Sequence, residues 1–432
     1  MSKYITDLVI QVDYKIQKII HYFSRLIYSD AVILIPPTQY AVGTCAEEIR
    51  HGYELAQKTN QNLVLIKLWS FNQILGFKHG NSKLFDLKIK EFKNDSLVKL
   101  KILLIKIINN IYFAFRRMLF MSIIKRLGIF SAQQKNKMSF PYYSYEYVVA
   151  KLVKLKGTRI ASFTLDVAGS NYKRSENFLK TLNKNFSYKN KYICIHVRSS
   201  VYYNDGNRRN FRNADASNYC ALINKAIADG YMVIVLGKVD TEDKISNIES
   251  VIDLRKIKHD DMVDICAIKH CNIYVGMQSG PLDLALLLKK NILIVNGYNY
   301  THLSEYRSKM ILYLKNVQNE RATEYLLNLP IKIHNINTLN YKRQWIEMSE
   351  SELERAFIFA KNCFENDDIF EVELQKSIAM AAKVDIVKSN LLEAMKQSKD
   401  SAYKLSNGYS YRAIICNYEA NQAMNQNTCI YK

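Results

Sequence analysis

The sequence has few of the residues that interrupt regular structure, with 5 prolines and 14 glycines among 432 residues. This shortage argues against long disordered linkers, which are typically rich in such residues. Tryptophan is also scarce, at 2 residues, but aromatic residues together make up 12% of the chain and hydrophobic residues 48%. That composition is ample for packed cores, and the length predicts two or three domains.

Paired cysteine and metal-binding spacings are missing as well. The 8 cysteines are scattered singly, without a C-x-x-C pair or paired histidines, and no D-x-D motif is present. Several cysteines lie within apolar runs, where a thiol behaves as a small core residue. We therefore expect a reducing, cytosolic compartment and no structural zinc.

Long uncharged hydrophobic runs are absent. No stretch of about eighteen apolar residues is present that would cross a bilayer. The first ten residues contain Lys3 and Asp7 and have no long apolar core behind them, so no secretory signal peptide is expected. The sequence therefore predicts a cytoplasmic protein, with peripheral contact to the inner face of the plasma membrane as an open alternative.

Acidic residues are too few to balance the basic ones, since 40 acids face 61 lysines and arginines and leave a formal charge of +21. This excess favours an anionic partner such as lipid headgroups or phosphorylated substrates. Nucleic acid is disfavoured, because the lysines are spread over the whole chain. One basic stretch, at about 84–128, mixes cations densely with apolar residues. It has two interpretations: helices packed inside the first domain, or an interfacial helix on an anionic membrane surface.

The first 182 residues are predicted to form an N-terminal domain on the acceptor side. Residues 1–30 have apolar side chains at helical spacing, and this face is expected to pack on the domain or on a partner. Residues 31–35, a helix from Val42 and residues 62–67 form a βαβ unit that opens a Rossmann-like domain. Its loop is no G-x-G-x-x-G fingerprint, so dinucleotide binding is not supported. A helix from 146 and a strand at 160–165 complete this domain, and 183–190 is the expected linker.

Residues 190–345 are predicted to form a second Rossmann-like domain, followed by a helical tail at 346–432. Strands at 192–197 and 232–236, a helix at 217–229 and the strand-helix alternation of 251–297 are typical of a doubly wound sheet. Ligands of such sheets bind at the carboxyl ends of the strands. His196, Arg198, Gly237 and Ser279 all fall at such ends.

Two features at these strand ends suit a phosphate. The Arg198 guanidinium can bind two phosphate oxygens at once. Ser279-Gly280-Pro281 opens a helix, where glycine allows close approach, proline suits the first turn and free N–H groups favour an anion. A loop with Arg208, Arg209 and Arg212 adds positive charge. Simpler interpretations stay open: an ordinary helix start, a solvated basic loop, and His196 packed in the strand end rather than positioning a donor.

These motifs resemble known glycosyltransferases. HVR at His196–Arg198, with RRNFRNAD and GMQSG downstream, resembles a glycosyltransferase family from bacterial surface-polysaccharide gene clusters. The HVR is similar to the H-x-R motif of the O- and α1,6-fucosyltransferase superfamily, and the SGP segment is similar to that of heptosyltransferases. The resemblance covers residues 190–300 well and 31–67 loosely. It implies a GT-B architecture, in which two Rossmann-like domains face a cleft and the C-terminal one binds the nucleotide-sugar.

The chain departs from both named patterns. The fucosyltransferase motif would place an acid where Val201 stands. The heptosyltransferase segment would place aspartate at Gln278 and histidine at Asp283. Neither GDP-fucose nor ADP-heptose is therefore implied, and the donor sugar stays open.

The sequence thus predicts sugar transfer from a nucleoside diphosphate donor, as co-substrate, to a glycan or lipid-linked acceptor in bacterial surface polysaccharide synthesis. We expect no metal and no further cofactor. Arg198 would stabilise the leaving group, and Asp205, Asp215 or Glu47 would be the base, although Asp215 also suits a helix N-cap. The expected donor-binding residues are His196, Arg198, Arg212, Asn213, Gly237, Gln278, Ser279, Gly280 and Pro281. The alternatives are a basic adaptor without catalysis, on nucleic acid or anionic membrane, and a degenerate transferase.

Overall fold

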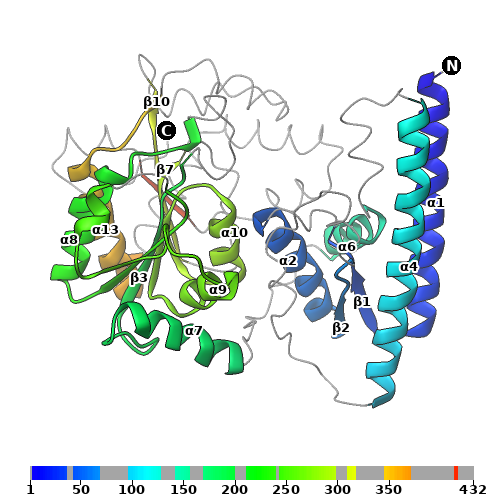
Figure 1. Cartoon of the computed structure of the whole chain (residues 1–432), viewed down its shortest axis with the longest axis horizontal. Helices are drawn as coiled ribbons and strands as arrows, with labels where there is room; N and C mark the ends of the chain where they lie inside the picture. The colour runs from blue at the N-terminus through cyan, green and yellow to red at the C-terminus, as the bar shows by residue number, and fades with distance from the viewer. Residues whose placement is uncertain are drawn as a thin grey trace. The chain divides into compact units, whose positions relative to one another are not determined.

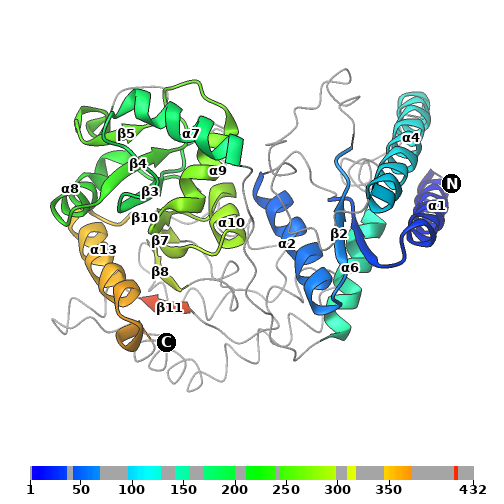
Figure 2. The ribbon, with the colours of Figure 1, turned by 90° about the horizontal axis from the view of Figure 1, so that it is seen from below.

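The computed structural model describes residues 2–36, 42–68, 96–127, 142–155, 169–199, 211–239, 243–297, 309–317, 345–370 and 413–416. The chain divides into an N-terminal unit, Met1–Ala168, and a C-terminal unit, Gly169–Lys432. Figures 1 and 2 show the elements of each unit.

The C-terminal unit is built on a parallel sheet of seven strands in the order β11-β8-β7-β6-β3-β4-β5. The strands are β3 (Tyr192–His196), β4 (Met232–Leu236), β5 (Val251–Asp253), β6 (Ile273–Gly276), β7 (Asn291–Gly297), β8 (Met310–Leu314) and β11 (Ala413–Cys416). Counted from β3, the first six follow the 3-2-1-4-5-6 order of a doubly wound fold. The predicted strands are confirmed from β3 to β7, while β8 and β11 were not predicted.

Helices cover both faces of this sheet (Figure 1). One face carries α8 (Cys220–Ala228) and α13 (Glu350–Glu365), and the other carries α9 (Asp261–His270) and α10 (Gly280–Leu287). The alternation of a β-strand explains this: Ile193 and Ile195 join the buried cluster with α8 and α13, and Tyr192, on the other face, reaches the Ala267 carbonyl of α9 (2.7 Å). Two short 3₁₀ helices, η4 (Ala216–Tyr219) and η5 (Lys244–Asn247), lie on the α8 side.

The predicted linker at 183–190 is wrong, because the chain turns there inside the C-terminal unit. Phe186 and Tyr188 are buried, and their rings lie 5.5 and 6.3 Å from the Tyr192 ring. Helix α7 (Gly169–Leu182), placed in the first domain by the sequence, packs against α9, where Arg174 pairs with Asp260 (2.8 Å). These buried aromatic residues tie the polar stretch to the C-terminal unit, and the boundary between the two units lies before Gly169.

The residues after 346 are not merely a tail. Helix α13 buries Leu353, Phe357 and Cys363 against the sheet, and β11 pairs with β8. The helix begins with a capping interaction, in which the Glu352 carboxylate accepts from the Ser349 N–H (2.5 Å). Residues 371–412 and 417–432 of the predicted helical tail lie outside the described residues.

The N-terminal unit holds α1 (Ser2–Ile27), β1 (Ala31–Leu34), α2 (Val42–Lys58), β2 (Asn62–Leu65), α4 (Ser96–Leu127) and α6 (Tyr142–Lys154). Strands β1 and β2 pair in parallel across α2, so the predicted βαβ unit is confirmed. The described part of this unit shows these two strands alone. The strand expected at 160–165 lies outside it.

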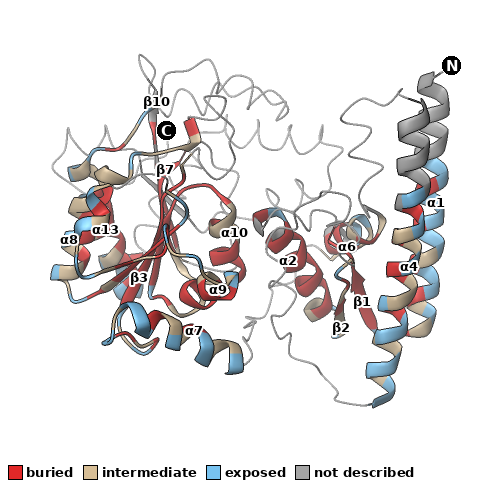
Figure 3. Ribbon diagram, viewed as in Figure 1, coloured by how far each residue is buried: buried red, intermediate tan, exposed pale blue. Residues whose placement is uncertain are grey.

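Helices α1 and α4 differ most from the prediction. Within the basic stretch, residues 96–127 form one helix, α4, of 32 residues. It runs antiparallel to α1, because Asp13 meets Arg116 and Ser24 meets Asn109. Polar side chains of α1 point inward, so its apolar face does not pack on the domain, and packing on a partner stays a prediction. Figure 3 shows exposed positions along both helices. Within the described residues, no helix combines the length and apolarity needed to cross a membrane.

Candidate functional site

The predicted site residues meet at the carboxyl ends of β3 and β6. These strands are neighbours, with His196 opposite Gly276. From β3 the chain winds outward through β4 and β5 and then returns to β6 on the other side. The junction between β3 and β6 is thus the topological switch point, where doubly wound sheets bind their ligands.

His196 lies at the end of β3 and contacts the turn that follows β6. Its Nδ1 is 3.0 Å from the Ser279 Oγ, which also lies within hydrogen-bond distance of the Met277 carbonyl (3.2 Å). Both side chains are buried. Burial, and then the nearby charge of Arg198, lowers the pKa of His196 to about 4. The imidazole is therefore neutral at pH 7 and acts here as a hydrogen-bonding group.

Gly237 closes the same corner from the end of β4. Its φ of +122° is unfavourable for residues with a side chain. A Cβ at this position would lie 3.1 Å from the Val197 carbonyl oxygen and 3.6 Å from His196 Nε2. The position therefore requires glycine for the backbone to pass this close to the histidine.

The turn after β6 leads directly into α10. Ser279 is the N-cap residue, but its side chain makes no capping hydrogen bond, because it is turned toward His196. Gly280 and Pro281 open the helix, with the proline in its first turn. Pro281 has no N–H, and the Leu282 N–H donates to the Ser279 carbonyl (3.0 Å), so the Gly280 N–H and the helix dipole are what this start can offer a bound anion.

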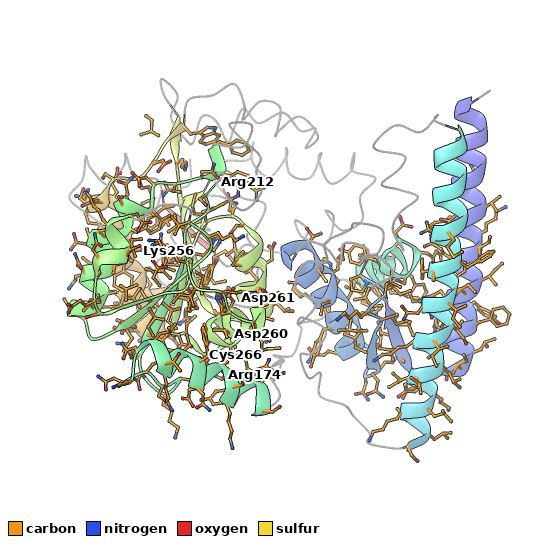
Figure 4. All side chains as sticks on the ribbon, in the orientation of Figure 1. Arg174, Arg212, Lys256, Asp260, Asp261 and Cys266 are labelled. Atoms are coloured by element: carbon orange, nitrogen blue, oxygen red, sulfur yellow. The ribbon has the colours of Figure 1, made fainter. Side chains whose placement is uncertain are left out.

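A loop at 211–215 contacts both the end of β3 and the turn that follows β6. Arg198, buried at the end of β3, donates from Nη1 to the Asn213 side chain. Arg212 donates from Nη2 to the Gln278 carbonyl (2.9 Å), and Figure 4 shows it far from the Arg174–Asp260 pair of α7 and α9. Two guanidinium groups are thus held beside the turn that begins α10.

The sequence did not single out Lys315, which the structure adds to this group. It follows β8, and its buried ammonium donates to the Asn213 carbonyl (2.6 Å) and lies 3.7 Å from Glu347 Oε1. Burial lowers the pKa of Lys315 to about 8, although Glu347 opposes the shift. The signal was present in the sequence, because Lys315 directly follows an apolar strand, as Arg198 nearly does.

The candidate bases are less well placed. Asp215 is exposed and its carboxylate accepts from the Ser217 N–H (2.9 Å), which confirms the N-cap interpretation. Its own N–H donates to Glu347 (2.8 Å). Asp205, like Arg208 and Arg209, lies outside the described residues, and Glu47 belongs to α2 of the other unit. The structure therefore brings together the predicted donor-binding residues, while the role of base stays a prediction.

This corner gathers groups that suit an anion. Arg198, Arg212 and Lys315 contact the loop at 211–215 or the turn before α10, and such groups can donate hydrogen bonds to a phosphate. Within the described ranges, no group of three histidine, cysteine or acidic side chains could hold a metal ion. Whether the reaction needs a metal is decided by turnover in the presence of a chelator.

Three comparisons with known proteins were made. No family model matches the sequence, and no curated protein matches it. Among solved structures, ADP-heptose LPS heptosyltransferase II of E. coli is 12% identical, with a TM-score of 0.34 over 61% of this chain and 84% of that one. A glycosyl transferase family 9 protein of Veillonella parvula is 11% identical, with a TM-score of 0.35 over 61% and 80%. The iron-containing dodecameric glycosyltransferase TibC of enterotoxigenic E. coli is 12% identical, with a TM-score of 0.27 over 47% and 50%. These scores are too low to support a conclusion about this chain, which is similar to glycosyltransferase structures without being assigned to their family.

Proposed function

We propose that this chain is a glycosyltransferase whose C-terminal unit binds the diphosphate of a nucleoside diphosphate sugar. The observation that carries the proposal is the meeting of His196, Arg198 and Ser279 at the ends of two neighbouring parallel strands. A doubly wound sheet binds nucleotides at this point, and an arginine beside a helix start suits a diphosphate.

In the proposed reaction an acceptor hydroxyl oxygen forms a bond to the anomeric carbon of the donor sugar. The bond from that carbon to the diphosphate oxygen breaks, and the diphosphate leaves with the electron pair. Arg198 and the Gly280 N–H at the start of α10 stabilise the growing negative charge, each donor contributing about 3 kcal/mol. Asp205 or Asp215 takes the proton of the acceptor hydroxyl.

The wider prediction adds a GT-B arrangement, a glycan or lipid-linked acceptor and a place in bacterial surface polysaccharide synthesis. These follow from the motif resemblance at residues 190–300. The same resemblance leaves the nucleoside and the sugar open, because Val201, Gln278 and Asp283 replace the residues of the named families. The sugar is therefore to be found with a donor panel.

Calorimetry with UDP, GDP, CDP and ADP tests the binding step on the full chain. We expect one nucleotide to bind, and Arg198→Lys to weaken it at least about tenfold, since lysine cannot bind two phosphate oxygens in one plane. Arg174→Lys is the matched control, because Arg174 is exposed on α7 and pairs with Asp260 away from the site.

With a donor found in the panel, Arg198→Lys should keep the fold and lose most turnover. Transfer rates equal to wild type would rule out the proposed role of Arg198.

Two further measurements separate the alternatives. Turnover that survives EDTA supports the metal-independent mechanism, and turnover that is lost and then restored by a divalent cation contradicts it. A basic adaptor without catalysis would retain RNA at physiological salt, with an affinity that falls steeply as salt rises, and would bind no nucleotide at the strand ends. A degenerate transferase would bind the nucleotide without transferring or hydrolysing any donor.

A further inference from the structure

Helix α1 is turned inside out. The side of α1 that faces the rest of the N-terminal unit carries Asp13, Gln17, His21 and Ser24, all buried. Arg116 of α4 binds Asp13 with two hydrogen bonds (2.5 and 2.6 Å), and Gln17 donates to the same carboxylate (2.9 Å). The inward side of α1 is thus polar, and Asp13 and Arg116 satisfy each other's charge.

The outward side of α1 is apolar. At 3.6 residues per turn, one stripe along the helix gathers side chains spaced three and four residues apart, on the side away from the buried polar residues. Its members are 41% to 61% exposed: Val12, Ile16, Ile19, Phe23 and Leu26. A soluble surface helix normally shows the reverse arrangement, with its apolar stripe toward the core.

The outward side of α4 is apolar in the same way. Its side toward the unit is mixed, because Asn109, whose amide donates to Ser24 Oγ (2.9 Å), and Arg116 alternate with Ile105 and Phe113 of the apolar core. On the side away from these lie residues that are 42% to 64% exposed: Leu100, Leu104, Ile111 and Phe115. The two stripes lie on adjacent antiparallel helices and together hold nine exposed apolar residues, whereas the exposed apolar residues of an ordinary surface are scattered singly.

The charges that α1 and α4 expose among their described side chains are of one sign. The α4 sequence contains seven lysines and arginines and no acid. Among the described side chains of α1 the one acid, Asp13, is buried against Arg116, while Lys15 and Lys18 are exposed. Lys99 and Lys106 of α4 are exposed as well. The described charges that these two helices expose are therefore cations.

We propose that the outward face of α1 and α4 docks on a membrane surface that contains anionic lipid, with both helices lying in the interface. Apolar stripes enter the boundary between headgroups and acyl chains, and the lysines meet the negative surface potential. A second copy of this chain fits less well, because a symmetric contact of this face would bring its lysines against those of the partner. The inward polar contacts of α1 allow this orientation, while Ile105 and Phe113 of α4 hold the helix pair to the apolar core around β1 and β2.

Co-sedimentation of the full chain with vesicles, without any sugar donor, tests this proposal apart from the proposed transferase activity. Vesicles of phosphatidylcholine with and without phosphatidylglycerol are compared. We expect binding to the anionic vesicles that weakens as salt rises. The quadruple variant Ile19→Gln, Phe23→Gln, Ile111→Gln and Phe115→Gln should reduce binding at least about tenfold, because it removes much of the apolar area that enters the interface.

A matched variant tests whether the effect belongs to this surface. Leu182→Gln, Ile346→Gln and Ile369→Gln remove apolar side chains that are 39% to 48% exposed on the C-terminal unit, and vesicle binding should stay at the wild-type level. The proposal is overturned if the wild type does not bind anionic vesicles, or if the quadruple variant binds them as well as wild type. A wild-type dimer in solution that the quadruple variant converts to a monomer, without any vesicle binding, would assign the face to a second copy.

Discussion

Helices α1 and α13 are both amphipathic, but they are placed opposite ways round. Helix α13 buries its apolar side, including Leu353, Phe357 and Cys363, against the doubly wound sheet. Helix α1 buries its polar side and leaves Ile19 and Phe23 more than half exposed. The comparison shows that an amphipathic pattern fixes two faces of a helix without fixing which one is inside.

The largest expected effects come from breaking the inner contacts of each helix. Phe357→Ala should lower the free energy of unfolding by about 3–5 kcal/mol, because it leaves a cavity in an apolar core. Arg116→Met should cost a similar amount, about 3–5 kcal/mol, because it leaves the Asp13 carboxylate buried without its cation. Urea unfolding measures both. The double variant Asp13→Leu with Arg116→Met should regain most of the loss, and a harmless Arg116→Met would show that α1 is not held by this pair.

Acid should destabilise both units, because each of them buries a neutral histidine. Burial first, and then Arg25, lowers the pKa of His21 to about 4, and His196 of the C-terminal unit is lowered to about 4 by burial and Arg198. As the pH falls below about 6.5, these two histidines therefore become protonated in the unfolded chain before they do in the folded chain. The contribution of each neutral histidine to the free energy of unfolding is fully present above pH 6.5. It is lost between pH 6.5 and pH 4, by up to about 3 kcal/mol for each histidine. His21→Gln and His196→Gln should each reduce this slope, and a slope unchanged in both would contradict the assignment.

A smaller effect concerns the charged corner of the C-terminal unit. Because the pKa of Lys315 is lowered to about 8, its positive charge is largely lost between pH 7 and pH 9. Nucleotide affinity should fall over this range by roughly a factor of three, since one nearby cation is removed. In Lys315→Met the affinity should already be low at pH 7 and should no longer change with pH. Calorimetry at pH 7 and pH 9 measures both, and an unchanged wild-type affinity would exclude Lys315 from the anion site.

The smallest effect should come from the outward side of α1. Ile19→Gln and Phe23→Gln are expected to change the free energy of unfolding by less than about 0.5 kcal/mol each, because both side chains already contact solvent. Leu353→Ala, on the buried side of α13, should cost about 2–5 kcal/mol by comparison. A large loss on replacing Ile19 or Phe23 would mean that this face is covered within the chain.

Much of the C-terminal unit could be predicted from its sequence. Apolar runs such as 192–197 and 232–236 identify buried strands, and the carboxyl ends of parallel strands share one edge of a sheet. This rule alone places Arg198 and Ser279 at the same edge. Lys315 was missed because the strand that precedes it was not recognised. The linker at 183–190 was wrong because a polar composition hid Phe186 and Tyr188, whose burial depends on Tyr192.

The sequence by itself determined the periodic pattern of each element, because the spacing of apolar residues along a strand or helix is a local property. The helix at 1–30, the βαβ unit and the strand-helix alternation of 251–297 follow from it. The tertiary structure alone decided that β6 lies beside β3, which brings Ser279 to His196, and that Lys315 joins them. It also decided that α1 turns Asp13 inward, because the partner that makes this burial favourable, Arg116, is 103 residues away along the chain.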